Sequence, residues 1–206
     1  MTGRPTRILE PDTLSHAERT KLLNGIVVPR PIAFVSTLSP GGAANLAPFS
    51  YFNVVGDDPM ALSFSITAPK ADGSEKDTLR NVRPRVEGGM GEFVVNAAAA
   101  EYAAKVAACG VALDYGHSEF EHSGLTPAPC SKVAIPRVLE APAWFECRTL
   151  QIVPIGRSNV VIGEILAVGI RPELLDERLR VDIEALDLIA RLAGAGYCRI
   201  GERFDL

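Results

Sequence analysis

The feature that constrains the fold most is a pair of long strand-like segments, residues 143–154 and 158–170, separated by the turn IGRS. Because so short a turn cannot cross over a sheet, the two segments are expected to pair as an antiparallel hairpin. Residues 31–37 and 45–53 flank the turn SPGG and predict a second hairpin. Residues 60–67, MALSFSIT, alternate apolar and polar side chains as a half-buried strand does. The chain is therefore expected to be mainly β and antiparallel.

Helices are expected as insertions between these strands. In residues 15–25, Ser15 and Glu18 have the spacing of a capping box, and Gly25 is expected to end the helix. The other expected elements are a short helix at 76–83, a strand at 92–98, an alanine-rich helix at 98–109, a long surface excursion over 110–143 with one helical turn near 118–124, helix or turns at 181–194, and a last strand at 197–206. No linker divides the chain, so residues 1–206 are expected to form one domain, an antiparallel barrel with helical insertions.

Composition and charge exclude several classes of protein. The net charge of −4 leaves the chain without the basic face that nucleic acid binding needs. No apolar run approaches the ~18 residues of a membrane span, and the first residues lack the apolar core of a signal peptide. A cytoplasmic protein with neither a nucleic acid nor a membrane partner is therefore expected.

The cysteines and histidines are scattered along the chain. No C-x-x-C pair occurs, so buried free thiols are expected rather than a zinc site or a redox motif. His117 and His122 are five apart, the wrong spacing for two ligands on one helical face, and no metal is expected. The chain also lacks G-x-G-x-x-G, G-x-x-x-x-G-K-[ST] and G-x-S-x-G, which disfavours a Rossmann domain, a P-loop and a serine hydrolase.

The segment NLAPFSYFN, residues 45–53, has an unusual composition for a strand. Pro48 cannot donate a hydrogen bond to a sheet, and the small residues Ala47 and Ser50 lie close to it. One interpretation is that a flat molecule approaches the backbone here. The alternative is that Pro48 marks an edge strand or a bulge.

A second group of residues predicts an anion site. Ser63 and Ser65 lie on the hydroxyl face of the strand 60–67, and Lys76, Asp77 and Thr78 stand at a helix start. A helix N-terminus offers unpaired N–H groups and positive dipole character, which suit a phosphate. The alternatives are a solvent-facing strand surface for the serines and ordinary helix capping by Asp77.

These segments together resemble the flavin reductase-like family, whose members have an FMN-binding split barrel. The resemblance covers about residues 26–204, in family order, and departs from the usual pattern at Gly56 and Ala193. It rests on VPRPIA (28–33), VST (35–37), NLAPFS (45–50), KDT (76–78) with Asn81, EFVVN (92–96), FEHSGLTP (120–127), and RLAG (191–194) with Tyr197 and Arg199. The resemblance implies a mainly β, antiparallel split β-barrel with helical insertions.

The resemblance also implies roles for individual residues. The flavin ring, of FMN or of FAD, is expected to lie against the segment formed by Asn45, Leu46, Ala47, Pro48, Phe49 and Ser50. The phosphate is expected near Ser63, Ser65, Lys76 and Thr78, with Asp77 in the same block. His122, Arg191 and Tyr197 are candidates for the substrate side. The alternatives are a surface position for His122, core packing for Tyr197, and an ion pair of Arg191 with Glu184 or Asp187.

Two functions from different classes follow from the resemblance. The first is an NAD(P)H-dependent flavin reductase that passes hydride from the nicotinamide to FMN, forms a homodimer and supplies reduced flavin to a partner monooxygenase. The second is an FMN-holding split-barrel protein with little reductase turnover. A structural protein that has lost the site is a third option, and the intact residues 76–78 speak against it.

Overall fold

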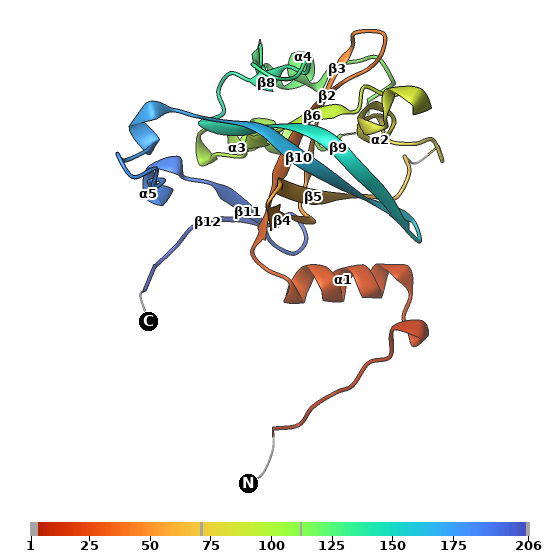
Figure 1. The fold of residues 1–206 in the computed structure, drawn as a ribbon. Helices are drawn as coiled ribbons and strands as arrows, with labels where there is room; N and C mark the ends of the chain where they lie inside the picture. Colours follow the sequence, from red (N-terminus) through yellow and green to blue (C-terminus); the bar gives the residue numbers. More distant parts are fainter. Residues whose placement is uncertain (1–3, 71, 112, 205–206) are drawn as a thin grey trace.

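The computed structural model describes residues 4–70, 72–111 and 113–204. Its centre is a seven-stranded sheet in the order β3-β2-β6-β9-β10-β5-β4, and every neighbouring pair is antiparallel (Figure 1). The strands are β2 (Ala33–Leu38), β3 (Ala44–Phe49), β4 (Phe52–Asp57), β5 (Met60–Thr67), β6 (Glu92–Ala97), β9 (Ala143–Ile155) and β10 (Ser158–Ile170). The two predicted hairpins, β2–β3 and β9–β10, are confirmed.

The two edge strands of this sheet follow each other directly in the chain. β3 ends at Phe49 and β4 begins at Phe52, so only Ser50 and Tyr51 connect the two edges. A connection this short reaches about 11 Å when fully extended. The sheet therefore has to curl until its edges approach each other, which gives an incompletely closed antiparallel barrel. The segment 45–53, expected as one strand, is in fact divided at this corner.

Two small sheets complete the β structure. β1 (Arg30–Pro31), β11 (Ile189–Arg191) and β12 (Tyr197–Arg199) form one, and β7 (Pro127–Ala128) and β8 (Arg137–Val138) form the other. The expectation of helix or turns over 181–194 is wrong for its second half, because β11 follows the short helix α5 (Ile183–Leu186). The predicted last strand is confirmed only as far as Arg199.

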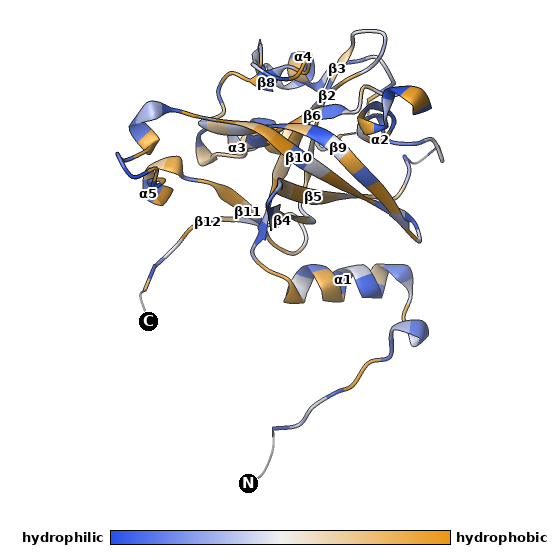
Figure 2. Cartoon of the chain, viewed as in Figure 1, coloured by the Kyte–Doolittle hydropathy of each residue, from blue (hydrophilic) through white to orange (hydrophobic). Residues whose placement is uncertain are grey.

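The helices are short insertions, as the sequence predicts. The capping box between Ser15 and Glu18 is present, and α1 (His16–Ile26) continues one residue beyond its expected end at Gly25. None of its residues is buried, and Figures 1 and 2 show it standing apart from the barrel. The other helices are η1 (Pro11–Thr13), α2 (Asp77–Val82), η2 (Arg85–Glu87), η3 (Ala100–Tyr102), α3 (Ala103–Ala108), α4 (Glu119–Ser123) and η4 (Pro172–Leu174). No helix among the described residues is long and apolar enough to cross a membrane.

The segment 110–143 is a surface excursion only in part, although the helical turn expected near 118–124 is confirmed as α4 (Glu119–Ser123). Phe120 and Val138 are buried and pack in the cluster that contains Phe34. The backbone N–H of Val138 donates to Asn96 Oδ1 over 2.8 Å, which ties the segment to β6. The segment therefore forms part of the core. Its apolar residues are widely spaced, so sequence periodicity does not reveal their common burial.

A second core cluster fills the barrel. The rings of Phe49 and Phe64 have centroids 5.2 Å apart, and those of Phe64 and Phe93 have centroids 5.4 Å apart. Gly163 on β10 makes room for this stack, because a Cβ there would lie 2.3 Å from Phe93 Cζ. The aromatic stack thus anchors β3 to the barrel interior, which fixes the position of the neighbouring Pro48 at the edge.

Candidate functional site

The candidate site is built around Pro48 on the edge strand β3. Pro48 faces Phe34 of β2, and β3 has no neighbour in the sheet on its other side. The missing N–H of proline therefore costs the sheet no hydrogen bond, as expected of a proline on an edge strand. Pro48 lines three cavities, which are called the first, the wide and the Tyr197 cavity.

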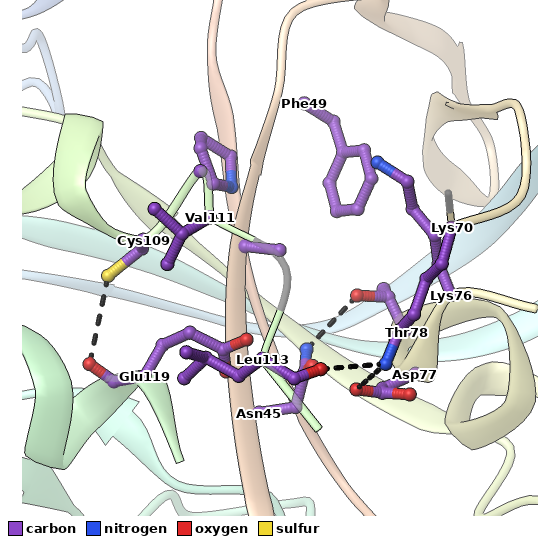
Figure 3. Close-up of a pocket in the computed structure, with 13 residues that line it drawn as sticks. Asn45, Phe49, Lys70, Lys76, Asp77, Thr78, Cys109, Val111, Leu113 and Glu119 are labelled. Atoms are coloured by element: carbon purple, nitrogen blue, oxygen red, sulfur yellow. Dashed lines mark hydrogen bonds and ion pairs between the residues drawn. The ribbon is translucent and has the colours of Figure 1, made fainter. Parts of the chain in front are cut away.

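The first cavity, of about 90 Å³, is lined by β3, by the start of α2 and by Cys109, Gly110, Val111 and Leu113. Asn45 Nδ2 donates to Thr78 Oγ1 over 3.0 Å, which joins β3 to α2 (Figure 3). Lys70 Nζ lies 2.9 Å from Asp77 Oδ2 and donates to the carbonyl oxygen of Leu113 over 2.9 Å. The predicted segments 45–50 and 76–78 thus form one wall of hydrogen-bonded side chains.

Two buried carboxyl groups line the first cavity. Glu119 Oε2 accepts the backbone N–H of Leu46 over 2.9 Å. Burial raises the pKa of Glu119, and the charge of Asp77 raises it further. Asp77 is 8% exposed, and its Oδ1 has no hydrogen-bond partner among the described residues. This part of the site therefore has an acceptor available for a ligand N–H.

The wide cavity, of about 480 Å³, is strongly basic. Its described lining contains no carboxylate, although the whole chain has a net charge of −4. The cationic side chains that line it are Arg19, Arg30, Lys76, Arg157 and Arg191. Burial lowers the pKa of Lys76, and the nearby charge of Lys70 lowers it further. Such a concentration of one charge on an acidic protein favours an anionic ligand.

Arg30 is a site residue to which sequence reasoning assigned no role. It is 5% exposed and donates to the carbonyl oxygens of Asn24, Val27 and Leu192 over 2.8, 2.9 and 3.0 Å. Its Nε also lies 3.4 Å from Ser50 Oγ. Arg30 therefore joins α1, the β3–β4 corner and the loop after β11. The sequence signal that could have identified Arg30 is its position between Pro29 and Pro31 in an otherwise apolar segment.

The Tyr197 cavity, of about 400 Å³, is lined by Pro48 and by Arg191 and Tyr197 of the β11–β12 pair. Arg191 and Tyr197 face each other across the β11–β12 pair, and Arg191 Cζ lies 4.5 Å from the centre of the Tyr197 ring. The ion pair that was considered for Arg191 does not form. Its two expected partners, Glu184 and Asp187, are paired instead with Arg203 and Arg199.

The predicted residues divide among these cavities. Asn45, Ala47, Asp77 and Thr78 line the first cavity, Ser50 and Ser65 the wide one, and Pro48, Phe49 and Lys76 line both. Of the predicted phosphate residues, Thr78 lines the first cavity and Ser65 the wide one, and Lys76 lies where the two cavities adjoin.

Three predicted residues lie outside these linings. The side chain of Leu46 is in the core, and only its backbone contributes to the site, through the hydrogen bond that its N–H donates to Glu119. Ser63 faces Asn53 of β4 and lines none of the three cavities. His122 is exposed in the last turn of α4. This agrees with the alternative interpretation, a surface histidine, rather than with a substrate contact. Among the described residues, no group of histidine, cysteine and acidic side chains is arranged to hold a metal ion.

Comparison with known proteins agrees with this architecture. The family described as "Flavin reductase like domain" matches residues 25–186. An uncharacterized protein of Aquifex aeolicus is 41% identical over 179 residues, which is 87% of this chain and 88% of that protein.

Two solved structures are similar over nearly the whole chain. Nitrilotriacetate monooxygenase component B from Bacillus cereus superposes with a TM-score of 0.92 at 32% identity, over 99% of this chain and 100% of that one. The 2-nitrobenzoate 2-nitroreductase NbaA of Pseudomonas fluorescens superposes with a TM-score of 0.86 at 33% identity, over 97% of this chain and 95% of that one.

Proposed function

The chain belongs to the flavin reductase-like family, and on that premise we propose that it is an NAD(P)H-dependent flavin oxidoreductase that binds FMN. The observation that supports this most is the wide cavity, whose described lining includes five cationic side chains and no carboxylate, together with the proline of the edge strand. FMN and the nicotinamide nucleotides are all anions with a flat ring. A basic cavity beside a flat, small-residue wall matches both properties.

The residues present fit a bound flavin. Ala47 and Pro48 offer a wall with little side-chain bulk, and Lys76, Ser65 and Ser158 offer a cation and two hydroxyls for the phosphate. The unpartnered Oδ1 of Asp77 is an acceptor that the ring N–H of a flavin would satisfy. A bound flavin supplies the capacity to accept hydride, so the protein itself needs no nucleophile. FAD is compatible with the same contacts.

The chain's own residues then have distinct roles. Lys76 binds the phosphate, Ala47 and Pro48 position the ring, and Arg191 and Tyr197 contact the second substrate. Arg30 holds the loop after β11 against the β3–β4 corner, which keeps Arg191 beside Ser50. These residues bind and orient; the reactive atoms belong to the nucleotides.

The proposal extends to partners. The Bacillus cereus relative is named as a component of a monooxygenase, which supports a role in supplying reduced flavin to a partner oxygenase. A homodimer is expected, and the exposed apolar residues Leu23, Ile26 and Val27 of the α1 region are suited to contact a second copy. A cytoplasmic location, without nucleic acid or membrane partners, completes the proposal.

The alternative function is an FMN-holding protein with little turnover of free flavin. The cations around the wide cavity support this alternative as well as the reductase, because a strongly held phosphate slows flavin exchange. An FMN titration of flavin-stripped protein, followed by steady-state NADH and NADPH oxidation with added flavin, separates the two. Saturable turnover supports the reductase, and tight binding near one FMN per chain without turnover supports the alternative. Absence of FMN binding overturns both.

A further inference from the structure

Helix α2 has two buried acceptor atoms whose hydrogen-bonding capacity is unused. Asp77 and Asn81 are one helical turn apart, so their side chains lie on the same face of α2. They are 8% and 1% exposed. Asp77 Oδ1 and Asn81 Oδ1 are the two buried side-chain polar atoms that receive no hydrogen bond from any described residue. Because buried acceptors in folded proteins are nearly always paired, these two oxygens point to a bound donor.

The amide of Asn81 is fixed from both ends. Its Nδ2 donates to Thr37 Oγ1 over 3.0 Å, and Thr37 is completely buried on β2. The backbone carbonyl of Asn81 accepts the N–H of Met90 over 2.7 Å. Because its nitrogen is engaged and its backbone is held, the side chain keeps its oxygen in the interior, away from bulk water.

The oxygen of Asn81 belongs to a buried polar layer between α2 and the strand pair β2–β3. Thr37 and Asn45 face each other across these two strands. Asn45 Nδ2 donates to Thr78 Oγ1 (Figure 3), just as Asn81 Nδ2 donates to Thr37 Oγ1, so both amide–hydroxyl bonds join a strand to the helix. Each threonine oxygen accepts in these bonds and keeps its own hydroxyl proton for another partner. The layer therefore offers both acceptors and donors to one small molecule.

We propose that one buried water molecule binds in this layer and bridges Asn81 to Asp77. The water donates one hydrogen to Asn81 Oδ1 and the other to Asp77 Oδ1, and it accepts the hydroxyl proton of Thr37. Three hydrogen bonds are the usual number for a buried water. The reach also agrees: side chains one turn apart have Cβ atoms about 5–6 Å apart, and a water about 2.8 Å from each of two acceptors spans a similar length.

Two other arrangements fit the layer less well. A sodium or potassium ion needs uncompensated negative charge, whereas Asp77 Oδ2 already lies 2.9 Å from Lys70 Nζ, and Lys76 lines the same first cavity. A direct bond from the Asn81 amide to Asp77 needs a free N–H on that amide. The Asn81 nitrogen is instead directed to Thr37. A water satisfies both oxygens without adding charge.

The water gives Asn81 a role in the site, although Asn81 lines none of the three cavities. A carboxylate oxygen has two lone pairs, so the water occupies one on Asp77 Oδ1 and leaves the other for a ligand in the first cavity. Held by Lys70 on one oxygen and by the water on the other, the Asp77 carboxylate cannot rotate. Asn81 is thus a positioning residue for the acceptor of the flavin ring N–H. That role rests on the proposed function, whereas the water does not.

The water is tested by a high-resolution crystal structure of the full, flavin-free chain, grown from a rubidium chloride solution. A density peak within hydrogen-bond distance of both Asp77 Oδ1 and Asn81 Oδ1, without the anomalous signal of rubidium, is expected. Asn81→Leu should lose the peak, and Arg80→Gln, at an exposed position of the same helix, should keep it. No peak in the native chain, a rubidium signal at the site, or a direct contact between the Asn81 amide and Asp77 overturns the proposal.

The positioning role is tested by comparing riboflavin with 3-methylriboflavin, which lacks the ring N–H. Fluorescence titration of the native chain is expected to give about tenfold tighter binding of riboflavin, which Asn81→Leu abolishes and Arg80→Gln preserves. Asn81→Ala takes the place of Asn81→Leu if the leucine variant does not fold. Equal binding of the two flavins by the native chain, or a preference that survives in the folded variant, overturns the positioning role. If neither flavin binds while the crystal shows the water, the proposed function alone is overturned.

Discussion

The side-chain amide of Asn45 donates a hydrogen bond to the hydroxyl of Thr78 over 3.0 Å, although the two residues are 33 positions apart. This bond connects the edge strand β3 to the first turn of α2. Both partners are buried, so the contact is shielded from water. Because of it, the small-residue segment around Pro48 and the lysine that precedes α2 belong to one site.

Lys76→Ala is predicted to weaken FMN binding far more than riboflavin binding. Only FMN has a phosphate for this lysine, and a charge-assisted hydrogen bond contributes about 1.5–3 kcal/mol, roughly 10- to 100-fold in affinity. Fluorescence titration with both ligands measures the difference. Lys132→Ala, an exposed lysine elsewhere, is the control and should change neither affinity. Equal losses for both ligands would remove Lys76 from the phosphate site.

Ala47→Leu is predicted to block flavin binding without unfolding the chain. Ala47 is half-buried on β3 and lines the first cavity, so a larger side chain occupies the space proposed for the ring. Circular dichroism checks the fold and a flavin titration checks binding. Ala104→Leu, at an exposed position of α3, should leave both unchanged. An unaltered affinity of the Ala47→Leu protein for FMN would mean that the ring lies elsewhere.

Glu119→Gln is predicted to raise stability at alkaline pH and to flatten its pH dependence. Burial raises the pKa of Glu119, so the folded chain binds more protons than the unfolded chain above the usual value of 4.5. The stability of the native protein is therefore full below that value and declines as the pH rises through the raised pKa. Glutamine is neutral and keeps an acceptor for the N–H of Leu46.

The measurement is a series of thermal melts between pH 4 and pH 8. At pH 8 the Glu119→Gln protein should melt about 2–4 °C above the native chain, the shift that 1 kcal/mol produces at this size. Glu121→Gln, an exposed neighbour on α4, is the control. Parallel pH profiles of the native and Glu119→Gln chains would contradict the assignment.

Gly163→Ala is predicted to destabilise the barrel by about 1–3 kcal/mol through overpacking. The added Cβ would lie 2.3 Å from Phe93 Cζ, inside the stack that anchors β3. Urea unfolding measures the change in the free energy of unfolding. Gly25→Ala meets no atom within 4 Å and lies in α1, so it should not destabilise the chain. A Gly163→Ala protein as stable as the native one would show that the ring moves aside freely.

Arg30→Lys is predicted to lower stability by at least about 2 kcal/mol, although the charge is kept, because lysine cannot replace the planar fork of donors. The carbonyl oxygens of Asn24, Val27 and Leu192 would lose their shared partner. Hydrogen exchange should accelerate around Leu192. Arg157→Lys, an exposed arginine of the same wide cavity, should alter neither stability nor exchange. Native-like exchange in Arg30→Lys would contradict the role given to Arg30.

Several features of the protein were predictable because they depend on local patterns. The alternation in 60–67 identifies β5, and the short turns at 39–42 and 155–158 identify the hairpins. The capping box of Ser15 and Glu18 identifies the start of α1. The residue types within 45–50 and 76–78 led to the walls of the first cavity. Each of these signals lies within a few residues of the structure that it predicts.

Other features depend on contacts between distant segments, and the tertiary structure decided them. The three residues of β11 form a strand because β1 and β12 are there to pair with them. Phe120, Ile135 and Val138 are buried because β2 and β6 offer them an apolar surface. Glu119 reaches the site through the N–H of Leu46, 73 positions away. The cations of the wide cavity come from α1, β1, β11, the residue before α2 and the β9–β10 turn. By itself the sequence determined the two hairpins, the strand β5 and the start of α1. Only folding determined which side chains meet, because that depends on sheet closure and long-range packing rather than on local periodicity.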